Sequence, residues 1–225
     1  MIYKIMIINI FIYIINILNT IYLIKYKMEI ENNDKYDSYR VYKTCIEMLN
    51  DRNYNTTNFD INLSHNDFLK IEDINIFTTH NDTNEEIYIK IFDERTSIGI
   101  PEINKMIEGI KKEYGENIHI IIVIRNPKII NFKRLKYSNV EIFKMSFLII
   151  NITKHQYVPK HEPLTPDEQK IFLKNNKNIT LKTLPKIIIG QDSIARYFNM
   201  KVGQVCRIYR NNPNTGKSIT YRVGV

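Results

Sequence analysis

The 225-residue sequence predicts an α+β protein: an N-terminal mixed αβ domain, with helices around a small sheet, precedes a small α/β domain that ends in a hairpin. The first observation is that helical and strand-like segments alternate from residue 37 to residue 150, as in layered αβ domains. The second is that three of the seven prolines fall within residues 155–170, which is typical of a linker or an extended segment. We therefore expect domains over residues 28–146 and 147–225, with residues 1–27 apart from both.

The first domain is expected to hold three helices and four strands. Val41, Cys45, Met48 and Leu49 share one face of a helix over residues 37–50, with Asp37 as its candidate cap. Ser64 and Asp67 have the spacing of a capping box at the start of a short helix. The other expected elements are strands at 74–80 and 85–92 joined by a turn, a helix at 100–115, a buried strand at 117–125 and a short strand within 140–153.

The second domain is expected to begin with a helix that Thr165 caps, with Pro166 in its first turn. A shorter helix follows the cap residue Asp192, and two strands around NNPNTG (residues 211–216) form a hairpin. The stretch NNPNTGKS imitates a phosphate-binding loop. However, Asn211 occupies the position of the first glycine, and the seven residues after Ser218 have the pattern of a strand.

Charge divides the chain into an acidic front and a basic back. Residues 28–124 hold 10 Lys and Arg against 19 Asp and Glu, a net charge of −9. Residues 152–225 hold 13 against 4, a net charge of +9. A basic region favours nucleic acid or an acidic protein as partner, although a solvated surface explains the same charge.

The first 27 residues contain no acid and are mostly apolar, a length and composition that suit a membrane helix. Almost every residue type in this run is also encoded by A and T alone, so translation of AT-rich DNA upstream of a gene would produce it. Met28 then opens a polar stretch. We expect the native protein to begin at Met28 and to lack a membrane segment.

No set of residues in the sequence predicts a catalytic site, a metal site or a cofactor site. A nuclease of the restriction-enzyme type would pair Asp73 with an acid-x-Lys motif, but Tyr88 stands where the second carboxylate is needed. His155 and His161 have no third soft ligand nearby and are expected to make ordinary hydrogen bonds in loops. The two cysteines build neither a disulfide framework nor a Cys-rich zinc site.

Residues 125–137, RNPKIINFKRLKY, mix cations with aromatic residues. Such a mix grips phosphates without sequence preference. A solvated helix face with its aromatic residues in the core explains the pattern equally well. The candidate DNA-proximal residues are Arg125, Lys128, Lys133, Arg134 and Lys136.

The segments LPKI, DSIARYF, GQVCRIYR, TG and ITYRV follow one another across residues 184–223. In order and spacing they resemble the assembly domain of the fifth subunit common to the eukaryotic nuclear RNA polymerases, which has a counterpart in the archaeal polymerase. The likeness is dense over residues 147–225. It is weaker over 37–146, where YRVYKTCIEMLNDRNY resembles the first helix of the family's N-terminal jaw domain. Ser193 departs from the family's proline, and Asn126-Pro127-Lys128 replaces its Thr-Pro-Ser-Ala motif.

The resemblance implies a non-catalytic subunit of a DNA-directed RNA polymerase, without a cofactor. The assembly domain would dock on the largest subunit, and the jaw would hold downstream duplex DNA weakly. A cellular protein would lie in the nucleus; a viral one would lie in the cytoplasmic virus factory and the virion. The rival interpretations are a stand-alone nucleic-acid-binding protein, a degenerate nuclease and a membrane-anchored protein. The expected docking residues are Arg196, Tyr197, Gly203, Arg207, Arg210, Tyr221 and Arg222.

Overall fold

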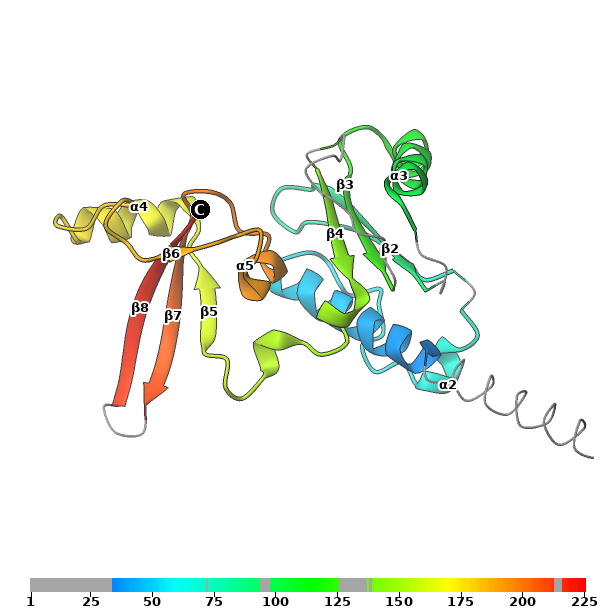
Figure 1. The fold of residues 1–225 in the computed structure, drawn as a ribbon, viewed down its shortest axis with the longest axis horizontal. Coiled ribbons are helices and arrows are strands. Elements are labelled where there is room, and N and C mark those ends of the chain that lie inside the picture. Colours follow the sequence, from blue (N-terminus) through cyan, green and yellow to red (C-terminus); the bar gives the residue numbers. More distant parts are fainter. Residues whose placement is uncertain (1–33, 72, 94–97, 126–136, 138, 213–215) are drawn as a thin grey trace, which may run out of the picture.

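The structure, a computed structural model, describes residues 34–71, 73–93, 98–125, 137, 139–212 and 216–225. Two four-stranded sheets lie side by side along the long axis of the molecule, with α5 (Ser193–Tyr197) between them (Figure 1). The strand orders are β1-β2-β3-β4 and β5-β7-β8-β6. Helices and mixed sheets together confirm the predicted α+β class.

The first sheet joins one antiparallel strand to three parallel strands. β1 (Asn75–Thr79) and β2 (Glu86–Phe92) form the predicted hairpin, and β3 (His119–Ile124) and β4 (Val140–Lys144) add in parallel. α3 (Ile100–Tyr114) makes the crossover from β2 to β3 that a parallel pair requires. The predicted strands and this helix are therefore confirmed.

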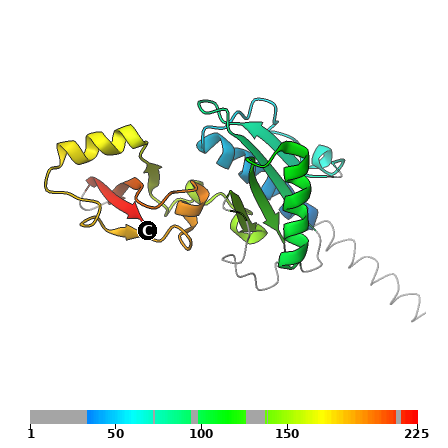
Figure 2. The same ribbon diagram turned by 90° about the horizontal axis from the view of Figure 1, so that it is seen from above.

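Helices cover both faces of this sheet. The helix over residues 34–51 packs against one face, where it meets Ile121 and Val123 of β3. α3 packs against the other, where it meets Ile120 and Ile122 (Figure 2). Because both faces of β3 are buried, its residues are apolar throughout and do not alternate with polar ones. Burying each such apolar side chain stabilises the fold by roughly 1.5–3 kcal/mol.

Three of the predicted helix caps are present, whereas Asp37 is not a cap, because the helix already includes residues 34–36. Ser64 accepts a hydrogen bond from the Asp67 N–H at the start of α2 (His65–Phe68). Thr165 and Glu168 form a reciprocal capping box at the start of α4 (Pro166–Asn175). Asp192 accepts hydrogen bonds from two backbone N–H groups of α5. Each local interaction satisfies backbone donors that a helix start leaves free, which is why the sequence predicted them.

The second sheet is built on the predicted hairpin of β7 (Val205–Asn212) and β8 (Gly216–Gly224). On one face Val205 and Val223 pack with Phe172 of α4. On the other face Cys206 and Ile208 pack with Ala195 of α5. The chain after Ser218 is a strand, so the hairpin interpretation of NNPNTGKS is confirmed.

Of the two alternatives for the proline-rich segment, a linker or an extended segment, the structure has the extended one. Residues Lys160–Pro163 form the edge strand β5, which pairs antiparallel with β7. Pro163 is tolerated there because an edge strand needs only half of its backbone donors. Two 3₁₀ turns, η2 (Met145–Phe147) and η3 (Ile152–Lys154), connect β4 to β5. The short strand β6 (Lys186–Ile187) forms the other edge of the second sheet, next to β8.

None of the helices in the described ranges is long and apolar enough to cross a membrane. Residues 1–27, on which the membrane alternative depended, lie outside those ranges.

Candidate subunit and nucleic-acid interface

The two sheets are joined through the side chain of Arg52, which follows the helix over residues 34–51. Its Nε and Nη2 donate hydrogen bonds to the carbonyl oxygens of Tyr197 and Arg196 at 2.7 and 2.9 Å. Its Nη1 and Nη2 also bind the two carboxylate oxygens of Glu141 at 2.8 and 3.0 Å. A planar guanidinium suits this geometry because its donors diverge in fixed directions. Arg52 therefore connects the helix, β4 and α5.

Glu141 is ionised at the centre of this contact. Burial alone would raise the pKa of its carboxyl, but the charge of Arg52 and hydrogen bonds from His119 and Arg52 outweigh burial and hold the pKa at about 2. The Nε2 atom of His119 lies 2.8 Å from Glu141 Oε1. We name the side chains of Arg52, Glu141 and His119 the clasp.

Tyr197 makes a second connection between the sheets. Its side chain is buried, and its hydroxyl donates a hydrogen bond to Asp51 at 2.7 Å. The Asn151 Nδ2 atom donates both to the Tyr197 hydroxyl, at 3.2 Å, and to Glu47, at 2.7 Å. Burial, followed by the bond to Asp51, raises the pKa of Tyr197. The phenol is therefore a neutral structural group.

Arg196 lies against β4. Its Nη2 donates to the Ile142 carbonyl oxygen at 2.6 Å, and its guanidinium lies 4.7 Å from the Phe143 ring and 5.1 Å from the Phe147 ring. Burial lowers its pKa. The structure thus gives Arg196 and Tyr197 contacts within the chain; their expected role in docking stays a prediction.

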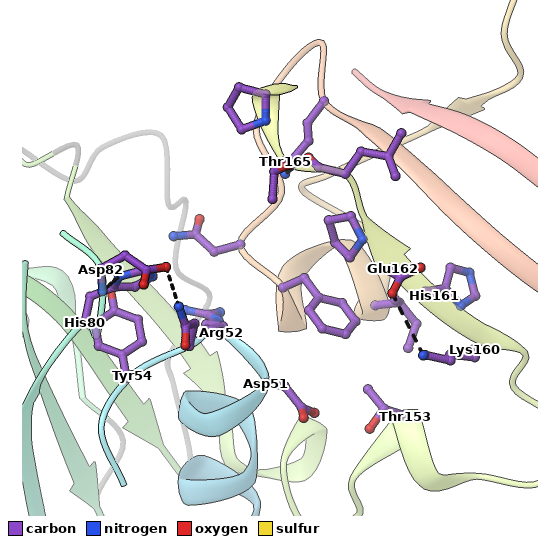
Figure 3. A pocket seen from close by; sticks show the side chains of 18 of the residues that line it. Asp51, Arg52, Tyr54, His80, Asp82, Thr153, Lys160, His161, Glu162 and Thr165 are labelled. Carbon is purple, nitrogen blue, oxygen red and sulfur yellow. Dashed lines mark hydrogen bonds and ion pairs between the residues drawn. The ribbon is translucent and has the colours of Figure 1, made fainter. Parts of the chain in front are cut away.

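A cavity of about 740 Å³ separates the two sheets on one side of the molecule (Figure 3). His80 and Asp82, from the β1–β2 turn, face Lys160 and Glu162 of β5 across it. His80 Nδ1 accepts the N–H of Asp82, and the His161 ring binds the Pro159 carbonyl oxygen at 2.7 Å. His155 Nδ1 likewise accepts the N–H of Tyr157. Both predicted histidines thus make ordinary local hydrogen bonds, although His161 lies in strand β5 and not in a loop.

The remaining docking candidates lie on or beside the β7–β8 hairpin. Gly203 has φ +82°, a conformation that favours glycine. Arg207 contacts Glu162 at 3.2 Å, and Tyr221 stacks on Phe172 with ring centroids 4.2 Å apart. Arg210 is exposed and Arg222 half-buried. Among the described residues, neither Arg210 nor Arg222 has an ion-pair partner, so these two arginines are the docking candidates with an unpaired charge to offer a partner.

Arg125 is surrounded by carboxylates. Its guanidinium contacts Asp34, Asp37 and Asp93, and it also donates to the Ser38 hydroxyl. These contacts tie the helix over residues 34–51 to the end of β3 and neutralise the arginine. Its expected proximity to DNA is untested, and Lys128, Lys133, Arg134 and Lys136 lie outside the described residues.

The positions weighed for a nuclease do not form a carboxylate pair. Asp73 is exposed and lies 4.0 Å from Lys90. Tyr88 is buried against α3, and burial raises its pKa to about 12. Within the described ranges, no three His, Cys, Asp or Glu side chains lie together as metal ligands. Both cysteines are buried, free thiols.

Sequence reasoning missed Arg52, Glu141 and Glu47. Arg52 stands in a short polar turn, DRNY, and its carboxylate partner is 89 residues away. No spacing rule connects such positions. A weak signal was available, since Glu141 is the one acid among six cations in residues 125–151.

The chain is similar to RNA polymerase subunits along most of its length. The family profile described as RNA polymerase Rpb5, C-terminal domain, matches residues 150–223, and that of the Rpb5 N-terminal domain matches residues 32–110. A relative from Dictyostelium discoideum, DNA-directed RNA polymerases I, II, and III subunit rpabc1, is 31% identical over 83% of this chain and 96% of its own.

Two other relatives agree with this assignment. One from Arabidopsis thaliana, DNA-directed RNA polymerase subunit 5-like protein 1, is 29% identical over 83% of this chain and 95% of its own. One from Caenorhabditis elegans, DNA-directed RNA polymerases I, II, and III subunit RPABC1, is 29% identical over 85% and 97%. The chain therefore belongs to the family of Rpb5, the fifth common subunit of DNA-directed RNA polymerases, whose members are non-catalytic components of the polymerase complex.

Proposed function

We propose that this chain is a subunit of a multisubunit DNA-directed RNA polymerase, in which residues 147–225 dock on the largest subunit. The observation that carries the proposal is the full-length match to the Dictyostelium discoideum subunit, which extends over 96% of that protein. Exposed apolar side chains support a docking surface beside Gly203: Ile188, Val202 and Val225 are 51%, 76% and 42% exposed. We propose a nuclear location in a cell, or the virus factory and virion for a viral protein.

We further propose that residues 28–146 lie beside downstream duplex DNA and hold it weakly. The basic stretch over residues 125–137 supports this placement through its charge. Because Arg125 is already paired with aspartates, the phosphate contacts are assigned to Lys128, Lys133, Arg134 and Lys136.

Purification of the native protein with an antibody against residues 28–146, away from the proposed docking surface, tests the proposal. The largest polymerase subunit is expected to co-purify in an amount equal to that of this chain. It is also expected to stay bound in 0.5 M salt, where the Debye length is about 4 Å and weak contacts between surface charges are screened. Recovery of the chain alone, bound to nucleic acid, would favour the stand-alone binding protein. Peptides from residues 5–24 in the same sample would contradict the expected start at Met28.

Replacement of docking residues refines the test. Alanine at both Arg210 and Arg222 is expected to reduce recovery of the largest subunit without lowering the melting temperature. The matched control replaces Lys174 and Lys177, two exposed cations near the end of α4. Equal loss in both double variants would show that net charge, and not these two arginines, drives docking.

A further inference from the structure

The outer edge of β8 is an open strand edge over most of its length. β7 pairs with β8 from Val205–Val223 to Asn212–Gly216. On the other side, β6 pairs only with Val223 and Gly224. The edge from Gly216 to Arg222 therefore has no strand beside it among the described residues.

Two hydrogen bonds identify which backbone groups face outward. The Val223 N–H donates to the Pro185 carbonyl oxygen on the β6 side, and the Gly224 N–H donates to the Gln204 carbonyl oxygen on the opposite side. Because backbone groups alternate along a strand, the N–H groups of Lys217, Ile219 and Tyr221 point to the open side. No described residue accepts a hydrogen bond from these three.

The pairing between β6 and β8 ends at a proline. A parallel ladder extended from the Lys186–Val223 pair would next need a donor at residue 185, opposite the Tyr221 carbonyl oxygen. That residue is Pro185, which has no N–H. The chain before it turns away through residues 181–184. Pro185 thus prevents β6 from pairing with more of β8, and the open edge of β8 begins where β6 ends.

The open edge carries an exposed apolar side chain between two cations, Lys217 and Arg222, so its charge disfavours pairing with a like basic strand and favours an acidic one. Ile219 is 51% exposed at its centre. The cations Arg207, Arg210, Lys217 and Arg222 belong to the described parts of β7 and β8, which contain no acid. Long edges with exposed apolar side chains invite pairing with another chain, and natural proteins cover them. The hairpin also extends beyond β5, whose ladder ends at the Lys160–Tyr209 pair (Figure 1).

We propose that an extended, acidic segment of the largest polymerase subunit adds to the β8 edge as a strand. This inference rests on the proposed function and specifies how docking occurs. Main-chain hydrogen bonds to Lys217, Ile219 and Tyr221 supply affinity, as in other cases of strand addition. Ile219 lies in a pocket of the partner, and carboxylates of the segment meet Lys217 and Arg222.

A proline at position 219 tests the proposal directly. Proline is tolerated on an edge where the N–H faces outward, so Ile219→Pro is expected to leave the melting temperature of the free chain within about 3 °C, equivalent to under 1 kcal/mol. It removes one donor and obstructs the approaching strand, so affinity for the largest subunit is expected to fall about tenfold or more. The control Ile219→Val keeps the N–H and most of the apolar side chain, and it is expected to lose much less affinity.

Hydrogen exchange provides an independent readout if Ile219→Pro fails to fold. In the free wild-type chain the amides of Lys217, Ile219 and Tyr221 are expected to exchange rapidly, and in the complex they are expected to be protected. Protection in the free chain would overturn the proposal, because a segment of the chain itself or a second copy would then cover the edge. Size measurement by light scattering distinguishes these two.

The outcomes separate this inference from the proposed function. If the wild-type chain binds the largest subunit and Ile219→Pro binds equally well, the chain docks by another surface and strand addition is wrong. If Ile219→Val and Ile219→Pro lose affinity equally, the side chain and not the backbone ladder carries the contact, which also refutes strand addition. If the wild-type chain does not bind at all, the proposed function fails.

Discussion

Replacement of Arg52 by methionine tests the clasp between the two sheets. The side chain of Arg52 is 5% exposed and makes four hydrogen bonds, two to Glu141 and two to backbone carbonyl oxygens of α5. Methionine keeps the length of the side chain but leaves these acceptors without a donor. Breaking a buried ion pair by removing one partner costs about 3–5 kcal/mol, and we expect a loss of that size at pH 7.

The pH dependence isolates the part that belongs to Glu141. Its pKa falls from an ordinary 4.5 to about 2 in the folded chain, a difference worth about 3 kcal/mol. Because the folded pKa is depressed, this stabilisation is present above pH 4.5 and is lost as the pH falls toward 2. Without Arg52 the pKa of Glu141 in the folded chain rises. The variant therefore does not lose this stabilisation when the pH falls below 4.5. The difference between wild type and variant should therefore shrink below pH 4.5.

Urea denaturation at pH 7, 5 and 3 measures this difference. Arg40→Met is the matched control, since Arg40 lies on the helix that Arg52 follows, is half-buried and has no ion-pair partner among the described residues. It is expected to change the free energy of unfolding by less than about 0.5 kcal/mol. A loss for Arg52→Met that stays constant from pH 7 to pH 3 would refute the coupling to Glu141.

Two further predictions concern the second domain and the basic stretch. Gly203→Ala is expected to destabilise the chain by about 1 kcal/mol in thermal melts, whereas Gly190→Ala does not, because both sites have room for a Cβ but only Gly203 has a positive φ. Alanine at Lys133, Arg134 and Lys136 is expected to shorten elongation-complex lifetime, more at low salt than at high salt, because exposed charges are screened within about 10 Å at 0.1 M. An unchanged lifetime at every salt concentration would assign these residues to a solvated face.

Local rules accounted for the elements that the sequence predicted. The cap at Ser64, the capping box of Thr165 with Glu168, and Gly115 at the end of α3 depend on residues within four positions of each other. The uniform apolar run of β3 likewise indicated a strand covered on both faces. Contacts between residues only a few positions apart follow from the spacing of those residues, so a single sequence is enough to predict them.

The sequence alone did not determine which arginines would be free. Arg125 looked like a phosphate ligand, because its neighbours in the chain are cations, yet three aspartates from two other elements surround it. Arg196 looked like a docking residue, yet Ile142 and two phenylalanine rings hold it. The partners of both arginines are distant in sequence, and only folding brings them within hydrogen-bond distance.

The same limit applies to the sheet edges. Residues 160–163 were predicted to be a linker or an extended segment, and pairing with β7 makes them a strand. The open edge of β8 depends on where Pro185 meets that strand, which requires the register of β6 as well as the sequence. Local spacing thus determined the helices and the hairpin of this protein, and the resemblance of residues 184–223 to a known subunit indicated the family. Tertiary structure decided which charges are paired and which backbone donors remain open, because both depend on distances between segments that the chain order does not encode.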